Sequence, residues 1–111
     1  MTEIVYGQLL NEIKDIKISD GIAAYNMLVT RAVLFVGTCE DDKEALDVLK
    51  KLLNGIDVAV TIIGQKINDT LKPDSKTEIY TRLIPFQALA TEVRGYILGL
   101  SLSPRLKQGE S

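Results

Sequence analysis

Two apolar stripes with helical spacing constrain the fold of this chain more than any other feature of its sequence. The first stripe steps by three and four residues from Leu46 to Ile67, and the second does the same from Ile79 to Leu100. This spacing keeps apolar side chains on one face of a helix. If the chain reverses at Pro73, the stripes meet as an antiparallel pair, with Ile67 opposite Ile79 and Leu46 opposite Leu100. We therefore predict a hairpin of two helices, each about 28 residues or 40 Å long.

Capping signals mark where the two long helices should start. Asp41 stands three residues before Glu44, and Ser75 stands three residues before Glu78. In a capping box of this spacing, the first side chain accepts a hydrogen bond from a backbone N–H of the first turn, and the glutamate side chain accepts one in return. We expect the long helices to begin at the residues that follow Asp41 and Ser75.

Two positions threaten the continuity of these helices. Asn54-Gly55 is a turn dipeptide, so a chain break there is the alternative to a continuous first helix. Pro85 has no N–H to donate and its ring crowds the preceding turn, which predicts a kink or a break in the second helix. We expect the first helix to end near Leu71 and the second near Leu102.

Two further helices should precede the hairpin. Apolar residues three or four apart predict a short helix from Glu3 to Ile16 and a second helix from Gly21 to Thr38, capped by Ser19 or Asp20. The second is apolar nearly all round, which is typical of a helix buried on several sides. Its residues 32–36 also resemble a strand in composition, but the sequence offers no second strand to pair with them.

The predicted fold class is therefore all-α: a four-helix bundle built on a long antiparallel helical hairpin. At 111 residues, the chain has the size of one domain, which we place at residues 1–102. The polar residues 103–111, with Pro104 as a helix stop, are expected to form a flexible C-terminal tail.

Composition argues against several classes of chemistry. There is no histidine and Cys39 is the only cysteine, so the sequence offers neither a histidine base nor a zinc ligand set. No glycine-rich phosphate-binding loop follows a predicted strand. We therefore expect no enzyme activity, no catalytic residue and no cofactor.

Charge and hydropathy bear on the cellular setting. The net charge of −2 argues weakly against a dedicated nucleic-acid binder. One cysteine allows no intrachain disulfide, the first residues lack a signal-peptide pattern, and the apolar run 22–36 is too short to span a bilayer. We expect a cytoplasmic protein that is not attached to a membrane. The aliphatic and lysine content, without histidine or tryptophan, resembles that of thermophilic proteins.

Carboxylates gather at the start of the first hairpin helix. Glu44 and Asp47 are one helix turn apart and are weak candidates for holding a magnesium ion. The alternative is structural, because acidic residues in a first turn complement the positive end of the helix dipole. We favour the structural interpretation and predict no metal site.

One family resemblance starts from these carboxylates. The segment Glu44–Leu49, followed by Gly55-Ile56-Asp57, resembles the second carboxylate motif of the MazG-like nucleotide pyrophosphohydrolases, over about a quarter of the chain. The resemblance implies an all-helical fold that binds magnesium through an ExxE pair on one helix and an ExxD pair on the next. The preceding helix departs from this pattern, since Arg31 stands where an acid is needed, and Glu12 and Asp15 could substitute only in another topology. A degenerate hydrolase is the third functional hypothesis.

Basic side chains support the second hypothesis, an accessory subunit of a nucleoprotein complex. In size and helicity alone, the chain is similar to the small subunits of CRISPR effector complexes and to viral DNA-associated proteins. A groove lined by cations would contact phosphates, whereas the alternative is ion pairing with acids such as Asp57 or Glu92. The possible nucleic-acid contacts are Arg31, Lys43, Lys50, Arg82 and Arg94.

The leading hypothesis is a non-enzymatic interaction or assembly subunit. Three of the predicted helices carry more apolar width than one seam uses, so a single small bundle would leave apolar surface in water. We predict a homo-oligomer, most simply a two-fold dimer, and a protein partner, with the half of the hairpin beyond Pro85 as the place of contact. The predicted interface residues are Tyr25, Val29, Phe35, Leu89, Tyr96 and Leu98.

Overall fold

The computed structural model describes residues 5–102, and four α-helices account for most of them. Helix α1 spans Tyr6–Asp15, a 3₁₀ turn follows at Ile18–Asp20, α2 spans Gly21–Thr38, α3 spans Asp42–Asp69, and α4 spans Pro73–Ser101. No strand occurs within residues 5–102. The predicted all-α class is therefore confirmed. Glu3, where the first helix was predicted to begin, and the predicted tail 103–111 lie outside the described residues.

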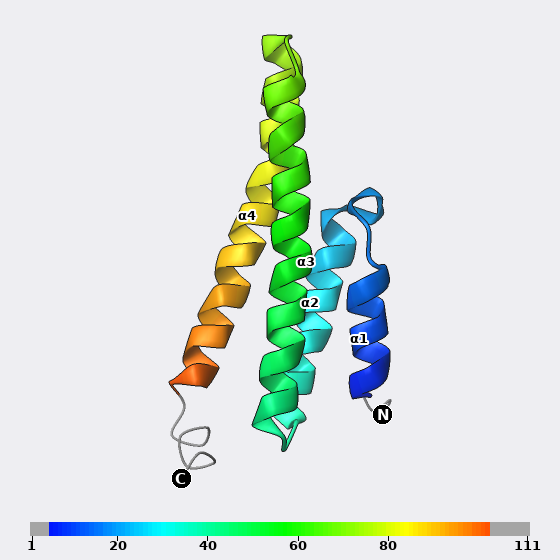
Figure 1. The fold of residues 1–111 in the computed structure, drawn as a ribbon, viewed down its shortest axis with the longest axis vertical. Helices are drawn as coiled ribbons and strands as arrows, with labels where there is room; N and C mark the ends of the chain where they lie inside the picture. Colours follow the sequence, from blue (N-terminus) through cyan, green and yellow to red (C-terminus); the bar gives the residue numbers. More distant parts are fainter. Residues whose placement is uncertain (1–4, 103–111) are drawn as a thin grey trace.

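Helix α3 is the centre of the bundle, because it packs against each of the other three helices. Figure 1 shows α3 and α4 as a long antiparallel hairpin that extends past α1 and α2 on the side of its turn. The predicted hairpin is thus present. One half of it packs against α1 and α2, and the other half stands beyond them.

The two apolar stripes face the interior of the bundle. Every stripe position between Leu46 and Ile67, and between Ile79 and Leu100, is buried or half-buried. Ile56 of α3 is fully enclosed in the core. Replacing such a side chain by alanine costs about 2–5 kcal/mol of unfolding free energy, which makes these contacts the main stabilising element of the hairpin. The level-by-level pairing of the stripes fits this burial and stays a prediction.

The two long helices start by different means. The Asp41 carboxylate accepts hydrogen bonds from the backbone N–H groups of Lys43 at 2.9 Å and Glu44 at 3.3 Å, which confirms the predicted cap of α3. The helix start predicted at Ser75 is wrong, because α4 already begins at Pro73. The fixed φ angle of proline suits the first helical position, and its missing N–H would have had no partner there.

Neither suspected interruption breaks a helix. Helix α3 is continuous across Asn54-Gly55, and α4 is continuous through Pro85. A glycine costs a helix about 1 kcal/mol and a proline about 3 kcal/mol, and packing along a long seam outweighs both. Figure 1 shows α4 diverging from α3 toward its C-terminal end.

The start of α2 depends on a turn that the sequence analysis did not predict. In the 3₁₀ turn, the Asp20 carboxylate accepts a hydrogen bond from the backbone N–H of Lys17 at 2.9 Å, so it does not cap α2 as predicted. Gly21 follows with a φ angle of 87°, which glycine adopts without strain. From there α2 runs to Thr38 as predicted, and helix rather than strand is confirmed for residues 32–36.

Helix α2 supplies a large share of the core. By length and composition alone, the segment Ile18–Thr38 would be able to cross a membrane. A core helix meets the same criteria, and in this structure the ring of Tyr25 packs edge-on against that of Phe86, with centroids 5.0 Å apart. The buried residues of α2 are Tyr25, Leu28, Val29, Ala32 and Phe35.

Candidate self-association surface

The face of α4 that points away from α3 carries an exposed apolar stripe. Its members recur three or four residues apart, so they line one side of the helix over about 33 Å. All of them are solvent-exposed and none is charged. We call this set the outer α4 stripe, and it consists of Tyr80, Ile84, Ala88, Thr91, Gly95, Leu98 and Leu102.

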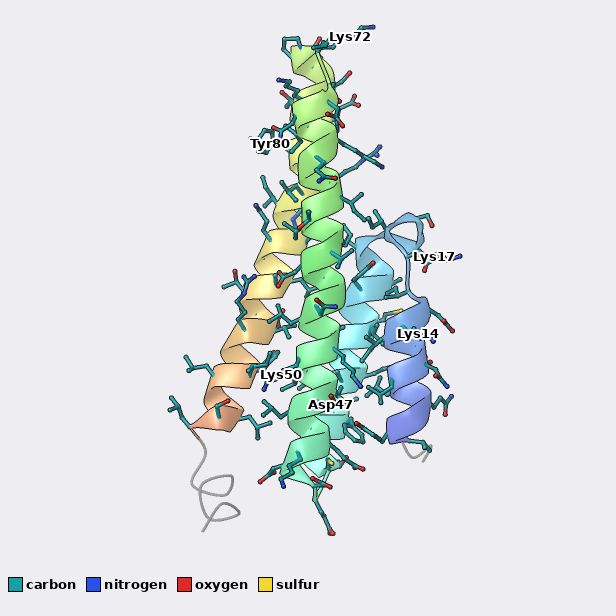
Figure 2. All side chains as sticks on the ribbon, viewed as in Figure 1. Lys14, Lys17, Asp47, Lys50, Lys72 and Tyr80 are labelled. Atoms are coloured by element: carbon teal, nitrogen blue, oxygen red, sulfur yellow. The ribbon has the colours of Figure 1, made fainter. Side chains whose placement is uncertain are left out.

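The large members of the outer α4 stripe leave most of their surface in water. Leu102 is 61% exposed, Ile84 and Leu98 are each 60% exposed, and Tyr80 is 53% exposed. Figure 2 shows Tyr80 on the side of the hairpin turned away from α1 and α2. Helix α4 is therefore apolar on two faces, of which α3 covers one and the other described helices leave the second exposed. A continuous open face of this kind is a mark of an interaction surface.

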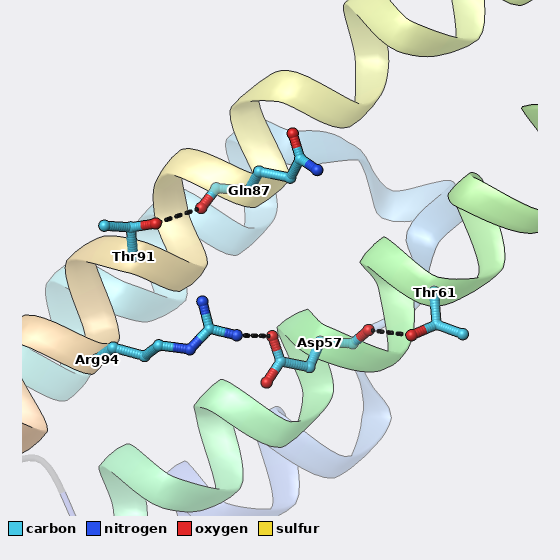
Figure 3. Close-up of polar contacts among 5 residues, drawn as sticks. All are labelled: Asp57, Thr61, Gln87, Thr91 and Arg94. Carbon is cyan, nitrogen blue, oxygen red and sulfur yellow. Dashed lines mark hydrogen bonds and ion pairs between the residues drawn. The ribbon is translucent and has the colours of Figure 1, made fainter.

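Polar groups beside the outer α4 stripe are satisfied within the chain. The hydroxyl of Thr91 donates a hydrogen bond to the backbone carbonyl of Gln87 at 3.1 Å, so burying this residue would not leave its hydroxyl donor without a partner. Arg94 reaches across to α3, where its Nη2 lies 2.8 Å from Oδ1 of Asp57 (Figure 3). The one arginine near the middle of the stripe is thus directed toward α3 and not toward the open face.

Four of the predicted interface residues belong to the core of the single chain. Tyr25, Val29, Phe35 and Leu89 are each at most 6% exposed. Their side chains pack α2 and α4 against the rest of the bundle, which corrects their assignment to an interface. In the sequence, core and interface positions on an apolar helix look alike, because both place the same residue types at the same spacing.

The other two predicted interface residues are accessible. Leu98 belongs to the outer α4 stripe, and Tyr96 is 39% exposed and lines a groove shared with α2. The Tyr96 hydroxyl donates a hydrogen bond to Glu92 at 2.7 Å, and this bond raises the pKa of the Tyr96 phenol. Tyr80, Ile84 and Leu102 were not predicted, although each lies four residues from the next member of the same exposed stripe.

The carboxylates at the start of α3 have structural partners. Tyr6 of α1 donates a hydrogen bond to Oδ2 of Asp47, and the ammonium group of Lys51 lies 3.1 Å from the same oxygen. These contacts, the Tyr6 bond first, lower the pKa of Asp47. Oε2 of Glu44 lies 4.0 Å from Sγ of Cys39. Among the described residues, no group of three or more His, Cys, Asp or Glu side chains is placed to hold a metal ion.

The residues that a second carboxylate pair would need are also engaged elsewhere. Arg31, which stands where the MazG-like pattern requires an acid, forms an ion pair with Glu12 of α1. Glu12 and Asp15 line a groove between α1 and α2 together with Arg31. In the described part of the chain they do not join Glu44 and Asp47 in one cluster. Among residues 5–102, these carboxylates therefore do not form the four-carboxylate magnesium site that the resemblance implies.

The five basic residues predicted as nucleic-acid contacts lie in different surroundings. Arg31 is paired with a carboxylate of α1, and Arg94 is paired with Asp57, as the ion-pair interpretation predicted. Lys43 and Lys50 are exposed near the start of α3, where Figure 2 marks Lys50. Arg82 lines a separate cavity beside the hairpin. The structure does not bring these cations together as one groove.

Comparison of the chain with protein-family models, with curated proteins and with solved structures finds no match. The geometry of the outer α4 stripe is therefore the basis of the functional inference.

Proposed function

We propose that this chain is a non-enzymatic assembly subunit that self-associates as a two-fold dimer through the outer α4 stripe. The observation that carries the proposal is an uncharged, exposed apolar face along most of α4. Burying a leucine or isoleucine side chain completely is worth about 1.5–3 kcal/mol relative to leaving it in water. A second copy of the same helix supplies apolar surface of the same length.

The spacing of the outer α4 stripe suits an antiparallel pair. Steps of four and three residues from Ile84 to Leu102 place its members at alternating a and d positions of a heptad, apart from the step into Ala88. Antiparallel packing about a two-fold axis sets Ile84 opposite Leu102, Ala88 opposite Leu98 and Thr91 opposite Gly95 of the second copy. The small Ala88 thereby faces the larger Leu98, and the small Thr91 and Gly95 meet at the centre, which allows close approach of the two helices.

The size of this contact fits a modest but specific dimer. Two helices in contact from Ile84 to Leu102, about 27 Å, bury on the order of 1,000 Å² over both chains, near the lower limit of specific interfaces. The contact is isologous, because the same face is used on both copies. It therefore closes after two chains and does not propagate into a filament.

Charged substitutions on the open face test the proposal. Ile84→Glu combined with Leu98→Glu would place four carboxylates in the dimer contact, each costing several kcal/mol when desolvated. Size-exclusion chromatography with light scattering should give a dimer for the native chain and a monomer for this variant at micromolar concentration. The matched control is Val58→Glu, since Val58 is 50% exposed on α3 and lies outside the outer α4 stripe. A control that dissociates as fully as the double variant would contradict the assignment of the interface to α4.

A further inference from the structure

A cavity of about 630 Å³ lies where the α3–α4 hairpin passes the start of α2. Helices α3 and α4 continue beyond the first turn of α2, as Figure 1 shows, and no described helix fills the space beside them. The cavity is bounded by the 3₁₀ turn, the first residues of α2, one face of α3 and the stretch of α4 around Pro85. It is thus built by three stretches that are distant in sequence, residues 18–22, 63–66 and 79–86.

The walls of this cavity are mainly apolar. Ile63 of α3 and Phe86 of α4 line the cavity and are buried, at 5% and 4% exposure. The remaining apolar walls are half-buried, and they come from Ile18, Ile22, Ile79 and Pro85. Small-molecule sites commonly have volumes of about 300–1,000 Å³ and predominantly apolar linings, so both the size and the chemistry of this cavity fall within that class.

The charges at the cavity have one sign. Lys66 from α3 and Arg82 from α4 both line it, and no aspartate or glutamate is among its lining residues. The chain as a whole has 15 acidic and 13 basic residues. A cavity whose charged lining residues are all cations therefore differs from the charge balance of the whole chain. Within the described residues, neither Lys66 nor Arg82 forms a salt bridge, and both side chains are exposed.

We infer that this cavity binds a small anionic amphiphile, a molecule with an aliphatic body and one carboxylate or phosphate head group. The apolar walls would take the aliphatic body, and Lys66 and Arg82 would bind the head group, with the guanidinium offering paired donors to two oxygens. Ser19 and Thr81 also line the cavity. This inference goes beyond the proposed dimer, because it uses a different face of α4 from the outer α4 stripe.

Titration calorimetry of the full chain with decanoate tests the apolar part of the inference. Decanoate should bind with a stoichiometry of one per chain. The affinity should fall about fourfold for each methylene removed along the series to octanoate and hexanoate, which is the effect of about 0.8 kcal/mol per buried methylene. Acetate should show no measurable binding. Equal affinity for acetate and decanoate would overturn the inference, because it would indicate simple anion attraction.

Charge reversal tests the two cations. Lys66→Glu and Arg82→Glu should each lower the affinity for decanoate about tenfold or more. The matched control is Lys50→Glu, which changes the net charge equally at an exposed position of α3 that does not line the cavity. Circular dichroism should show unchanged helicity in all three variants. A loss of affinity in Lys50→Glu as large as in Arg82→Glu would overturn the assignment to this cavity.

Two further experiments distinguish a free amphiphile from the head group of a membrane lipid as the molecule that binds in the cavity. Binding of free decanoate together with sedimentation of vesicles of anionic phospholipid, but not of zwitterionic phospholipid, would support the cavity and identify lipid head groups as a source. Sedimentation with anionic vesicles and no binding of free decanoate would overturn the inference. The Ile84→Glu and Leu98→Glu double variant should keep its affinity for decanoate, so failure of the dimer and failure of the cavity are distinguishable.

Discussion

The hydroxyl of Tyr6 on α1 donates a hydrogen bond to the carboxylate of Asp47 on α3, 41 positions further along the chain. This bond joins the first helix to the central helix of the bundle. It also occupies a carboxylate that a MazG-like motif would use for magnesium. The environment of Asp47 is therefore that of a structural acceptor, with Lys51 as its second partner.

Stability at alkaline pH should depend on Tyr6. The hydrogen bond to Asp47 raises the pKa of Tyr6 from 10.0 to about 12. Its contribution to stability is complete below pH 10, where the tyrosine is neutral in both states, and is lost as the pH rises to about 12, because the unfolded state releases its proton first. Urea unfolding of the native chain and of Tyr6→Phe should therefore differ at pH 9 and converge toward pH 12.

The control for this experiment is Tyr80→Phe, because Tyr80 is 53% exposed on the outer face of α4. Its difference in unfolding free energy from the native chain should not shrink between pH 9 and pH 12 in the same way. A Tyr6→Phe difference that stays constant over this range would contradict the hydrogen bond as the cause of the shifted pKa.

Alanine substitutions near the starts of the two long helices should have unequal effects on the unfolding free energy. Asp41→Ala removes the acceptor for two backbone N–H groups of α3 and should lower the unfolding free energy by about 1 kcal/mol. Ser75→Ala should change it by less than about 0.5 kcal/mol, because α4 already begins at Pro73 and Ser75 lies within it. Chemical denaturation of both variants checks the pair, and equal losses would contradict the early start of α4.

Disulfide cross-linking can determine whether the two α4 helices of the proposed dimer pack antiparallel or parallel. In a Cys39→Ser background, Ala88→Cys combined with Leu98→Cys should give a covalent dimer on oxidation, since antiparallel packing sets these two positions opposite each other. Ala88→Cys alone should not, because the two copies of that position would be about 15 Å apart along the helices. Efficient cross-linking of the single variant would indicate parallel packing instead.

Most of the fold follows from the sequence because one periodic signal dominates it. The stripes from Leu46 and from Ile79 specify two long helices and an antiparallel arrangement, and burial confirms which faces turn inward. The start of α4 was misplaced because Pro73 at a first helical position outweighs the later capping signal at Ser75. The 3₁₀ turn before Gly21 was missed because Ser19 and Asp20 also suit the cap of the following helix, which is the role that was predicted for them.

The candidate surface was harder to predict for a physical reason. An apolar side chain at helical spacing is equally suited to the core and to a contact between chains. Leu89 turned out to be core, whereas Ile84 on the same helix is open. Only the position of α3 relative to α4 decides which apolar face is covered, and that position is a property of the folded bundle.

The central claim is that the outer α4 stripe holds two copies of this chain together. Size-exclusion chromatography with light scattering at micromolar concentration tests it most directly, because it measures the mass of the particle in solution. The account predicts twice the 12.2 kDa mass of the chain for the native protein and the mass of a single chain for the Ile84→Glu and Leu98→Glu double variant. A native protein that elutes with the mass of a single chain would contradict it.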